Sequence, residues 1–314
     1  MYQIKACIHA EEDITTLKLS INGRSFAMRG LGLEADCTAS IDQKVKLRPG
    51  KNELLIQVET ANTAVTSEKR IIEYKASTGG NYHALLIGVQ SYEDFAIDDL
   101  NEPIGDCQEL AHTLINDYTF ERSNVHQLSN PTKEQILEKL IYLQERLSKK
   151  DQLLIFYSGH GVVKNEIGYW LPADADKSSR VKWFSNAELR DYVNSINTQH
   201  TLVIADACFS GSIFTGGYRN VTEFACTEME KIPSRRAMTS GANTVVPDNS
   251  VFFEYLIKKL KENDSSCLSA ETLYSKVKPA VIYNSPNNHI PQFGVMPQTG
   301  DCLLYTSPSP RDRG

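Results

Sequence analysis

The sequence predicts a three-layer α/β domain preceded by a small all-β domain. Two observations lead to this prediction. In the first 76 residues, short apolar segments alternate with polar residues and are separated by turn signals. From residue 82 onward, short apolar runs without alternation lie between segments with helical spacing of apolar residues. The length of 314 residues and the hydrophobic content of 41% are sufficient for two such domains.

The N-terminal part, residues 1–76, contains several short strand patterns. Apolar residues alternate over residues 17–21 and lead into Asn22-Gly23, a dipeptide that favours a tight hairpin turn. Two further alternating segments flank Pro49-Gly50. This pattern is typical of an immunoglobulin-like β-sandwich. The part contains no cluster of chemically reactive side chains, so we expect an accessory domain that engages a protein partner, joined through a polar linker at residues 77–81.

The C-terminal part alternates between strand and helix patterns. Three apolar runs, Ala84–Val89, Leu153–Tyr157 and Thr201–Ala205, have the composition of strands buried on both faces of a parallel sheet. Helical spacing occurs between these runs, at residues 107–115 and 136–147. Capping boxes that would begin helices are found at Thr132 with Gln135 and at Ser185 with Glu188. In such sheets, active sites lie beyond the carboxyl ends of the strands.

Composition and charge exclude several classes of function. The net charge of −6 argues against nucleic acid or an anionic membrane as the main partner, because both require a basic face. No apolar run reaches the length of a membrane span, and the first residues do not form a secretion signal. The seven cysteines are scattered and include no C-x-x-C pair, so we expect reduced cysteines in a cytoplasmic protein.

A histidine and a cysteine follow two of the predicted parallel strands. His160 lies between glycines after the second apolar run, and Cys208 follows the third. If these strands are neighbours, about 5 Å apart, the two side chains can meet at one edge of the sheet. Such a pair supports nucleophilic catalysis by a thiolate. Either residue alone would be a packed structural residue, whereas the pair at equivalent strand ends favours catalysis.

The segments around these two residues resemble a known family. Tyr157–Gly161 (YSGHG) and Asp206–Gly211 (DACFSG) are similar to the two signature blocks of the caspase-like cysteine peptidases of clan CD, most of all to the bacterial and metacaspase branch. Further similar segments follow in the family's order at residues 83–89, 100–111, 168–172, 234–241, 291–294 and 300–305. The resemblance thus covers about residues 82–305, with a large-subunit-like part at 82–214 and a small-subunit-like part at 234–305.

The resemblance implies a caspase-like fold and a set of catalytic roles. Cys208 would be the nucleophile and His160 the general base and acid. The backbone N–H groups of Gly161 and Cys208 would form the oxyanion hole. The family has no obligatory carboxylate as a third catalytic member, so no aspartate is assigned to that role.

The resemblance also implies the specificity for P1, the substrate residue before the scissile bond. Asp206, Asp106 and Ser158 would line the S1 pocket, and two carboxylates there would select Arg or Lys at P1. The alternative is that Asp106 caps its helix and Asp206 binds nearby amides. An aspartate-specific pocket would need basic residues in their place.

Calcium and self-cleavage are two further properties of relatives. Many metacaspases bind calcium through an acidic cluster that includes an Asp-Asp pair, which residues 184–188 of this chain lack. Asp174 and Asp176 alone would provide fewer ligands than calcium takes, so we expect no cofactor and no calcium requirement.

The segment 215–233 would be a loop in which Arg219 or Lys231 suits self-cleavage, although an uncut loop is the alternative. The tail 306–314 is expected to be disordered.

The function that follows is a cytoplasmic cysteine endopeptidase that cuts protein substrates after Arg or Lys. Within the same class, the enzyme could be self-processing or silent until a partner binds. The alternative from a different class is a non-catalytic caspase-like scaffold or interaction protein.

Overall fold

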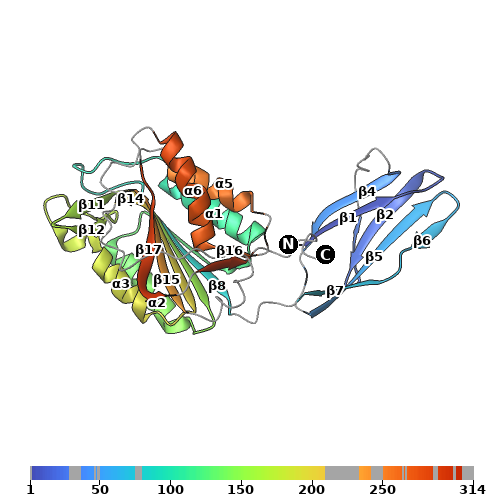
Figure 1. Cartoon of the computed structure of the whole chain (residues 1–314), viewed down its shortest axis with the longest axis horizontal. Helices are drawn as coiled ribbons and strands as arrows, with labels where there is room; N and C mark the ends of the chain where they lie inside the picture. The colour runs from blue at the N-terminus through green and yellow to red at the C-terminus, as the bar shows by residue number, and fades with distance from the viewer. Residues whose placement is uncertain are drawn as a thin grey trace. The chain divides into compact units, whose positions relative to one another are not determined.

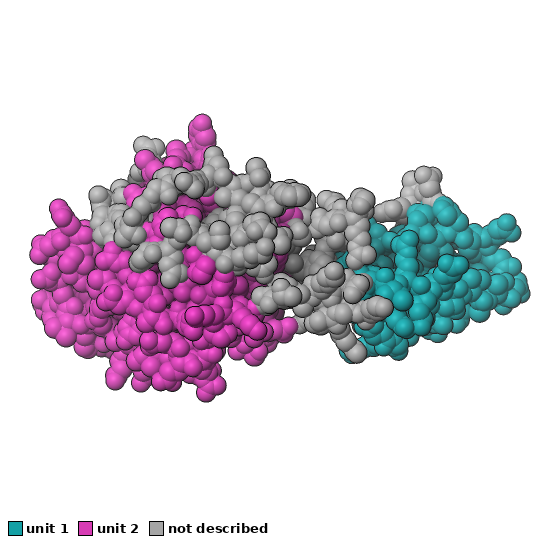
Figure 2. Space-filling view, turned by 60° about the horizontal axis from the view of Figure 1, so that its bottom comes forward, with its two compact units in different colours: residues 1–78, 307–314 teal, residues 79–306 magenta. Residues whose placement is uncertain are grey.

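The computed structural model describes residues 2–27, 37–45, 47, 50–74, 80–208, 233–241, 250–263, 265, 267–285, 289–299 and 302–305 (Figure 1). The chain divides into two compact units, one formed by residues 1–78 with 307–314 and the other by residues 79–306 (Figure 2). The predicted linker, the 215–233 loop and the tail lie wholly or largely outside the described residues.

The N-terminal unit is all-β, as the sequence predicts. One sheet pairs β1 with β4, and the other has the order β3-β2-β5-β6 with β7 also on β5. The strands are β1 (Tyr2–Ile8), β2 (Ile14–Ile21), β3 (Arg24–Ala27), β4 (Ala39–Val45), β5 (Gly50–Thr60), β6 (Ala64–Thr66) and β7 (Arg70–Tyr74). Ile4 and Ile41 of the first sheet share one buried core with Leu19 and Leu54 of the second. The two sheets therefore pack as a sandwich.

The N-terminal unit also corrects the expectation that all cysteines are reduced. Cys7 and Cys37 form a disulfide with their Cα atoms 5.4 Å apart. The antiparallel pairing of β1 with β4 places Cys7 opposite Ser40, three residues from Cys37. Cys267 is also disulfide-bonded, whereas Cys107 and Cys302 are free and buried. The sequence separation of 30 residues gives no sign of this pairing, because only the strand register creates it.

The C-terminal unit is built on a six-stranded sheet with the order β17-β15-β14-β10-β8-β9. The first five strands along the chain run parallel, and only the last is antiparallel, to β15. In chain order, the six strands are β8 (Tyr82–Gly88), β9 (Phe120–Ser129), β10 (Gln152–Ser158), β14 (His200–Cys208), β15 (Ser234–Gly241) and β17 (Gln292–Thr299). The predicted mostly parallel sheet is therefore confirmed.

Helices cover both faces of this sheet, which confirms the three layers (Figure 1). On one face, α1 (Pro103–Asp117), α5 (Val251–Lys261) and α6 (Ala270–Asn284) pack against side chains such as Leu86 and Phe156. On the other, α2 (Lys133–Arg146) and α3 (Asn186–Ser195) pack against Leu85 and Ile155. Both predicted capping boxes are present at the starts of α2 and α3. No described helix is long and apolar enough to cross a membrane.

Shorter elements complete the unit. A three-stranded antiparallel sheet of β11 (Gly161–Lys164), β12 (Ile167–Trp170) and β13 (Phe184–Ser185) follows directly after His160, with the 3₁₀ helix η1 (Arg180–Lys182) between β12 and β13. A second small sheet pairs β16 (Cys267–Ser269) with β18 (Leu303–Tyr305).

The register between β10 and β14 sets the geometry of the carboxyl edge. The two strands are neighbours, and Ser158 lies directly opposite Asp206. His160 and Cys208 each lie two residues beyond this pair. An irregularity in the pairing of β14 with β15 falls between Ala205 and Cys208, where Cys208 is opposite Gly241. Such bulges re-aim side chains beside active sites. The backbone therefore brings the two predicted catalytic positions to the same edge on adjacent strands.

Candidate active site

A cavity of about 510 Å³ lies at this carboxyl edge. Five of the predicted site residues line it together, although they come from three separate segments of the chain. They are Asp106, Ser158, His160, Gly161 and Asp206. The structure thus gathers the predicted base, one predicted oxyanion donor and the predicted S1 residues around one space.

The backbone of His160 is fixed from both sides. Its N–H donates to the Tyr92 hydroxyl at 2.9 Å. Its carbonyl accepts from the Tyr157 hydroxyl at 2.7 Å and from the N–H of Leu171 at 3.0 Å. The Tyr157 ring is itself stacked on Trp170 of β12, with the ring centres 4.4 Å apart. These contacts hold the histidine in one place at the end of β10.

A backbone carbonyl orients the imidazole. His160 Nε2 lies 2.8 Å from the carbonyl oxygen of Asp98, and the Tyr92 ring lies 5.1 Å from the imidazole. Because a carbonyl can only accept a hydrogen bond, Nε2 must carry the proton in this contact. In the neutral ring, Nδ1 is then the unprotonated nitrogen and can accept a proton. The Asp98 carbonyl thus orients the imidazole of His160, as a carboxylate orients the histidine in a catalytic triad.

The loop that carries the Asp98 carbonyl is held in place by hydrogen bonds. The Asp94 carboxylate accepts the N–H of Ala96 at 2.9 Å and that of Lys177 at 2.7 Å. The Lys177 ammonium donates to the carbonyl of Ala96 at 2.7 Å. Two loops that are far apart in sequence thus fix each other beside His160.

Three predicted residues receive only a partial description or none. Cys208 is the last residue of β14, and its backbone is described, but its side chain lies outside the described part of the structure. Arg219 and Lys231, the predicted positions of self-cleavage, lie outside the described residues.

A half-buried carboxylate, Asp106, and a buried one, Asp206, lie close enough to interact electrostatically. The Ser158 hydroxyl donates to Asp106 at 3.0 Å, and Asp206 is only 2% exposed. Burial, with the nearby charge of Asp206, raises the pKa of Asp106 to about 7. Burial also raises the pKa of Asp206 to about 6, an effect that the hydroxyls of Ser250 and Ser240 only partly offset. A cation that entered the cavity beside these carboxylates would offset the cost of ionising them.

The alternative roles considered for these aspartates do not match their contacts. The N-cap position of α1 is Glu102 and has no side-chain cap, while the Asp106 carboxylate binds Ser158 instead. Neither oxygen of Asp206 accepts a hydrogen bond from a backbone amide of the described residues. The contacts therefore favour a pocket for a ligand over a purely local structural role.

Sequence reasoning missed several participants. The Asp98 carbonyl is invisible in a sequence, because every residue carries one. Tyr92 and Ser250 gave no motif, yet Tyr92 holds His160 and Ser250 lines the cavity beside Asp206. The only available sign for Tyr92 was its place after the carboxyl end of β8, at the same edge of the sheet.

Comparison with known proteins shows the family of the chain. The family model for the caspase domain matches residues 81–301. The chain belongs to the caspase-domain family. Its members are cysteine peptidases that act on proteins, so the chain carries a peptidase-type domain.

Individual relatives are distant. Over 101 residues the chain is 34% identical to Metacaspase-1 of Eremothecium gossypii, an alignment that covers 29% of this chain and only 22% of that protein. The crystal structure of Caspase-1 from Spodoptera frugiperda superposes with a TM-score of 0.51 at 15% identity, covering 69% of this chain and 87% of that one. The protein GSU0716 from Geobacter sulfurreducens has a TM-score of 0.49 at 18% identity, covering 74% and 96%. The Spodoptera structure supports the caspase-like fold.

Gly159 offers a test of how tightly the histidine segment is built. Its φ of +156° is unfavourable for other residues, and a Cβ atom there would lie 2.8 Å from the Tyr157 hydroxyl. We expect Gly159→Ala to lower the free energy of unfolding by about 1–3 kcal/mol through backbone strain. Urea denaturation of the purified full chain measures this change.

Gly105→Ala is the matched control. Gly105 lies inside α1, and a Cβ atom there would have only a carboxylate oxygen of Glu102 near it, at 3.8 Å. This variant should gain about 0.5–1 kcal/mol from the higher helix propensity of alanine. Equal stabilities of Gly159→Ala and wild type would contradict the described geometry around His160.

Proposed function

We propose that this protein is a cysteine endopeptidase that cleaves after Arg or Lys by means of Cys208 and His160. The observation that carries the proposal is the pair of carboxylates, half-buried Asp106 and buried Asp206, in the same cavity as a histidine whose Nε2 is bound to a carbonyl. The family membership supports Cys208 as the nucleophile, and the acidic pocket supports the preference for Arg or Lys.

The catalytic steps follow from the groups at the edge. Nδ1 of His160 takes the proton of the Cys208 thiol, and the thiolate attacks the carbonyl carbon of the scissile bond. The N–H groups of Gly161 and Cys208 would stabilise the negative oxygen of the tetrahedral intermediate. The imidazolium then gives its proton to the leaving amine, which leaves a thioester on Cys208. Water, deprotonated by His160, hydrolyses this thioester and restores the thiol.

The acidic pocket gives the preference for a basic P1 side chain. A guanidinium or ammonium placed beside Asp106 and Asp206 would stabilise both ionised carboxylates, and the planar guanidinium of Arg can bind two oxygens at once. An Asp side chain in the same place would add a third negative charge. The described lining of this pocket therefore disfavours cleavage after Asp.

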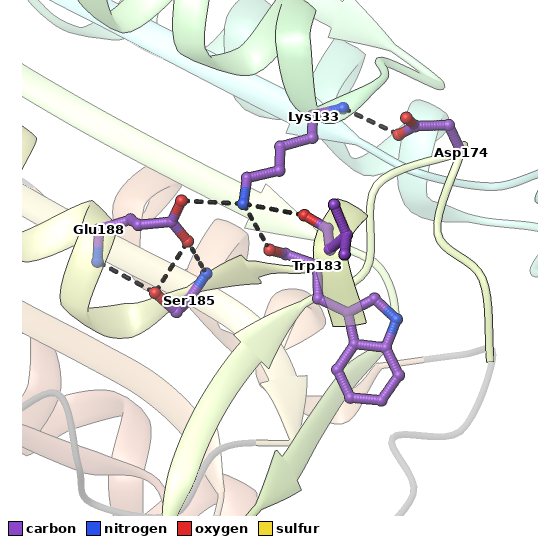
Figure 3. Close-up of polar contacts among 6 residues, drawn as sticks. Lys133, Asp174, Trp183, Ser185 and Glu188 are labelled. Atoms are coloured by element: carbon purple, nitrogen blue, oxygen red, sulfur yellow. Dashed lines mark hydrogen bonds and ion pairs between the residues drawn. The ribbon is translucent and has the colours of Figure 1, made fainter. Parts of the chain in front are cut away.

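We also propose that catalysis needs no calcium. The carboxylates beside the start of α2 are bound by the chain's own cations and amides (Figure 3). The Lys133 ammonium lies 2.8 Å from Glu188, and the backbone N–H of Lys133 donates to Asp174 at 2.9 Å. Lys182 pairs with the other oxygen of Asp174 at 3.5 Å. In the described part of the chain, no three His, Cys, Asp or Glu residues form a group that could hold a metal ion.

A panel of fluorogenic peptides tests the function. The peptides carry Arg, Lys or Asp at P1 in one fixed sequence and are assayed with calcium and with a chelator. We expect turnover of the Arg and Lys peptides only, unchanged by the chelator, and a loss of at least about 10³-fold in Cys208→Ala and His160→Ala. His112→Ala, an exposed histidine on α1, should keep wild-type activity.

Each other result has a defined meaning. Cleavage after Asp alone would contradict the roles of Asp106 and Asp206 while leaving the nucleophile in place. No cleavage of any peptide by the folded protein would point either to an enzyme that is silent until a partner binds or to the scaffold alternative. The alkylation rate of the Cys208 thiol would then decide between them. Fragments ending at Arg219 or Lys231 in wild type, and absent from Cys208→Ala, would identify self-processing.

The two carboxylates of the pocket predict a pH dependence of P1 selectivity. Because the pKa values of Asp206 and Asp106 are raised to about 6 and about 7, both groups are mostly neutral at pH 5.5 and ionised at pH 8. The ratio of kcat/KM for an Arg peptide over its neutral citrulline analogue should therefore rise about tenfold or more between these pH values. Both peptides use the same catalytic residues, so the ratio reports on the P1 pocket. A ratio that stays constant over this range would contradict the charge of the pocket.

A further inference from the structure

The cavity beside His160 extends beyond the acidic pocket. Its volume of about 510 Å³ is that of a site for a drug-sized ligand, which is larger than one side chain requires. Besides the acidic end formed by Asp106 and Asp206, the cavity has apolar lining residues, which we call its apolar end: Ile97, Val162, Val163, Leu171 and Trp183.

The acidic and the apolar lining residues come from different elements around the histidine. Ser158, which binds Asp106, precedes His160 by two residues, and Val162 of β11 follows it by two. Figure 1 shows β11 and β12 beyond the end of β14, on the other side from α1, which carries Asp106. A substrate chain that crosses His160 would therefore pass from the acidic end to the apolar end.

The chemistry of the second step decides which substrate residue meets the apolar end. His160 protonates the leaving amine, and that nitrogen belongs to P1′, the residue after the scissile bond. P1′ must then lie on the side of the imidazole away from the P1 pocket. Val162, the second residue of β11, follows His160 on the chain away from Ser158.

The apolar end is already shaped before substrate arrives. Ile97, Leu171 and Trp183 form a buried cluster, and Val162 packs against it. The indole N–H of Trp183 donates to the Asp176 carbonyl at 2.9 Å, so the polar atom of this ring is satisfied inside the protein. The edge of Tyr169 meets the Trp183 ring with the centres 5.5 Å apart. Binding an apolar side chain here would bury apolar area with little reorganisation.

Two positive charges flank this end and restrict what can enter. Lys164 and Lys177 both line the cavity and are exposed. The Lys177 ammonium is held 2.7 Å from the Ala96 carbonyl, which fixes its place beside Ile97. A basic P1′ side chain would meet like charges there, whereas an apolar one would not.

We propose that the cavity holds two substrate side chains, a basic P1 residue against Asp106 and Asp206 and an apolar P1′ residue on Ile97, Val162 and Trp183. This assignment rests on the proposed function and adds a second specificity site to it. In a substrate with two adjacent basic residues, the enzyme would cut after the second one, because cutting after the first would place a basic residue at P1′.

Internally quenched peptides with Arg fixed at P1 and Leu, Gly, Asp or Lys at P1′ test the proposal. For wild type, we expect kcat/KM to be about tenfold or more higher for Leu than for Gly, and lowest for Lys. Val162→Asp should remove the preference for Leu and raise the relative rate of the Lys peptide about tenfold. Val181→Asp is the matched control, because Val181 is 81% exposed and its side chain does not line the cavity.

Each preference is a ratio within one protein preparation, so partial misfolding of a variant does not change it. If Val162→Asp does not fold, Lys164→Glu provides a second test at an exposed position and should raise the relative rate of the Lys peptide. Equal wild-type rates for Leu, Gly and Lys, or a preference for Asp, would overturn the apolar P1′ site while leaving the proposed peptidase intact. No cleavage of any of the four peptides would overturn the proposed function together with this site.

Discussion

The parallel pairing of β10 with β14 is the constraint on which the rest of the site depends. Because Ser158 lies opposite Asp206, the residues two positions further on, His160 and Cys208, reach the carboxyl edge together on adjacent strands. The same register brings Asp206 near Ser158 and its partner Asp106. The burial of both strands between helices fixes this register, since a slip of one residue would turn buried side chains to the opposite face of the sheet.

Around this edge, polar groups are positioned mainly by the backbone. His160 is held through its own N–H and carbonyl and is oriented by the carbonyl of Asp98, so catalysis would need no third ionisable side chain. The charged groups are instead concentrated in the pocket. Asp106 and Asp206 are costly to ionise there because burial raises both pKa values, and a bound basic side chain would remove that cost. The positive charge of the substrate would thus stabilise the ionised forms of Asp106 and Asp206.

Much of the fold and part of the site could be predicted from sequence, for physical reasons. Strands buried on both faces require uninterrupted apolar runs, capping boxes mark helix starts, and parallel strands place their carboxyl ends at one edge. These rules predicted β8, β10 and β14, the starts of α2 and α3, and a common edge for His160 and Cys208. That β10 and β14 are neighbours was a condition of the argument, and only the structure establishes it. The Asp98 carbonyl and the Cys7–Cys37 disulfide were beyond reach, because each depends on tertiary contacts or strand register and leaves no pattern in residue types.

The central claim is that the edge of β10 and β14 makes Cys208 a reactive thiol through His160. The rate of alkylation of each cysteine by iodoacetamide, followed by mass spectrometry in wild type and His160→Ala, tests it most directly. We predict that Cys208 reacts faster than the buried Cys107 and Cys302, and that His160→Ala slows it about tenfold or more at neutral pH. Equal rates for Cys208 in the two proteins would contradict the claim.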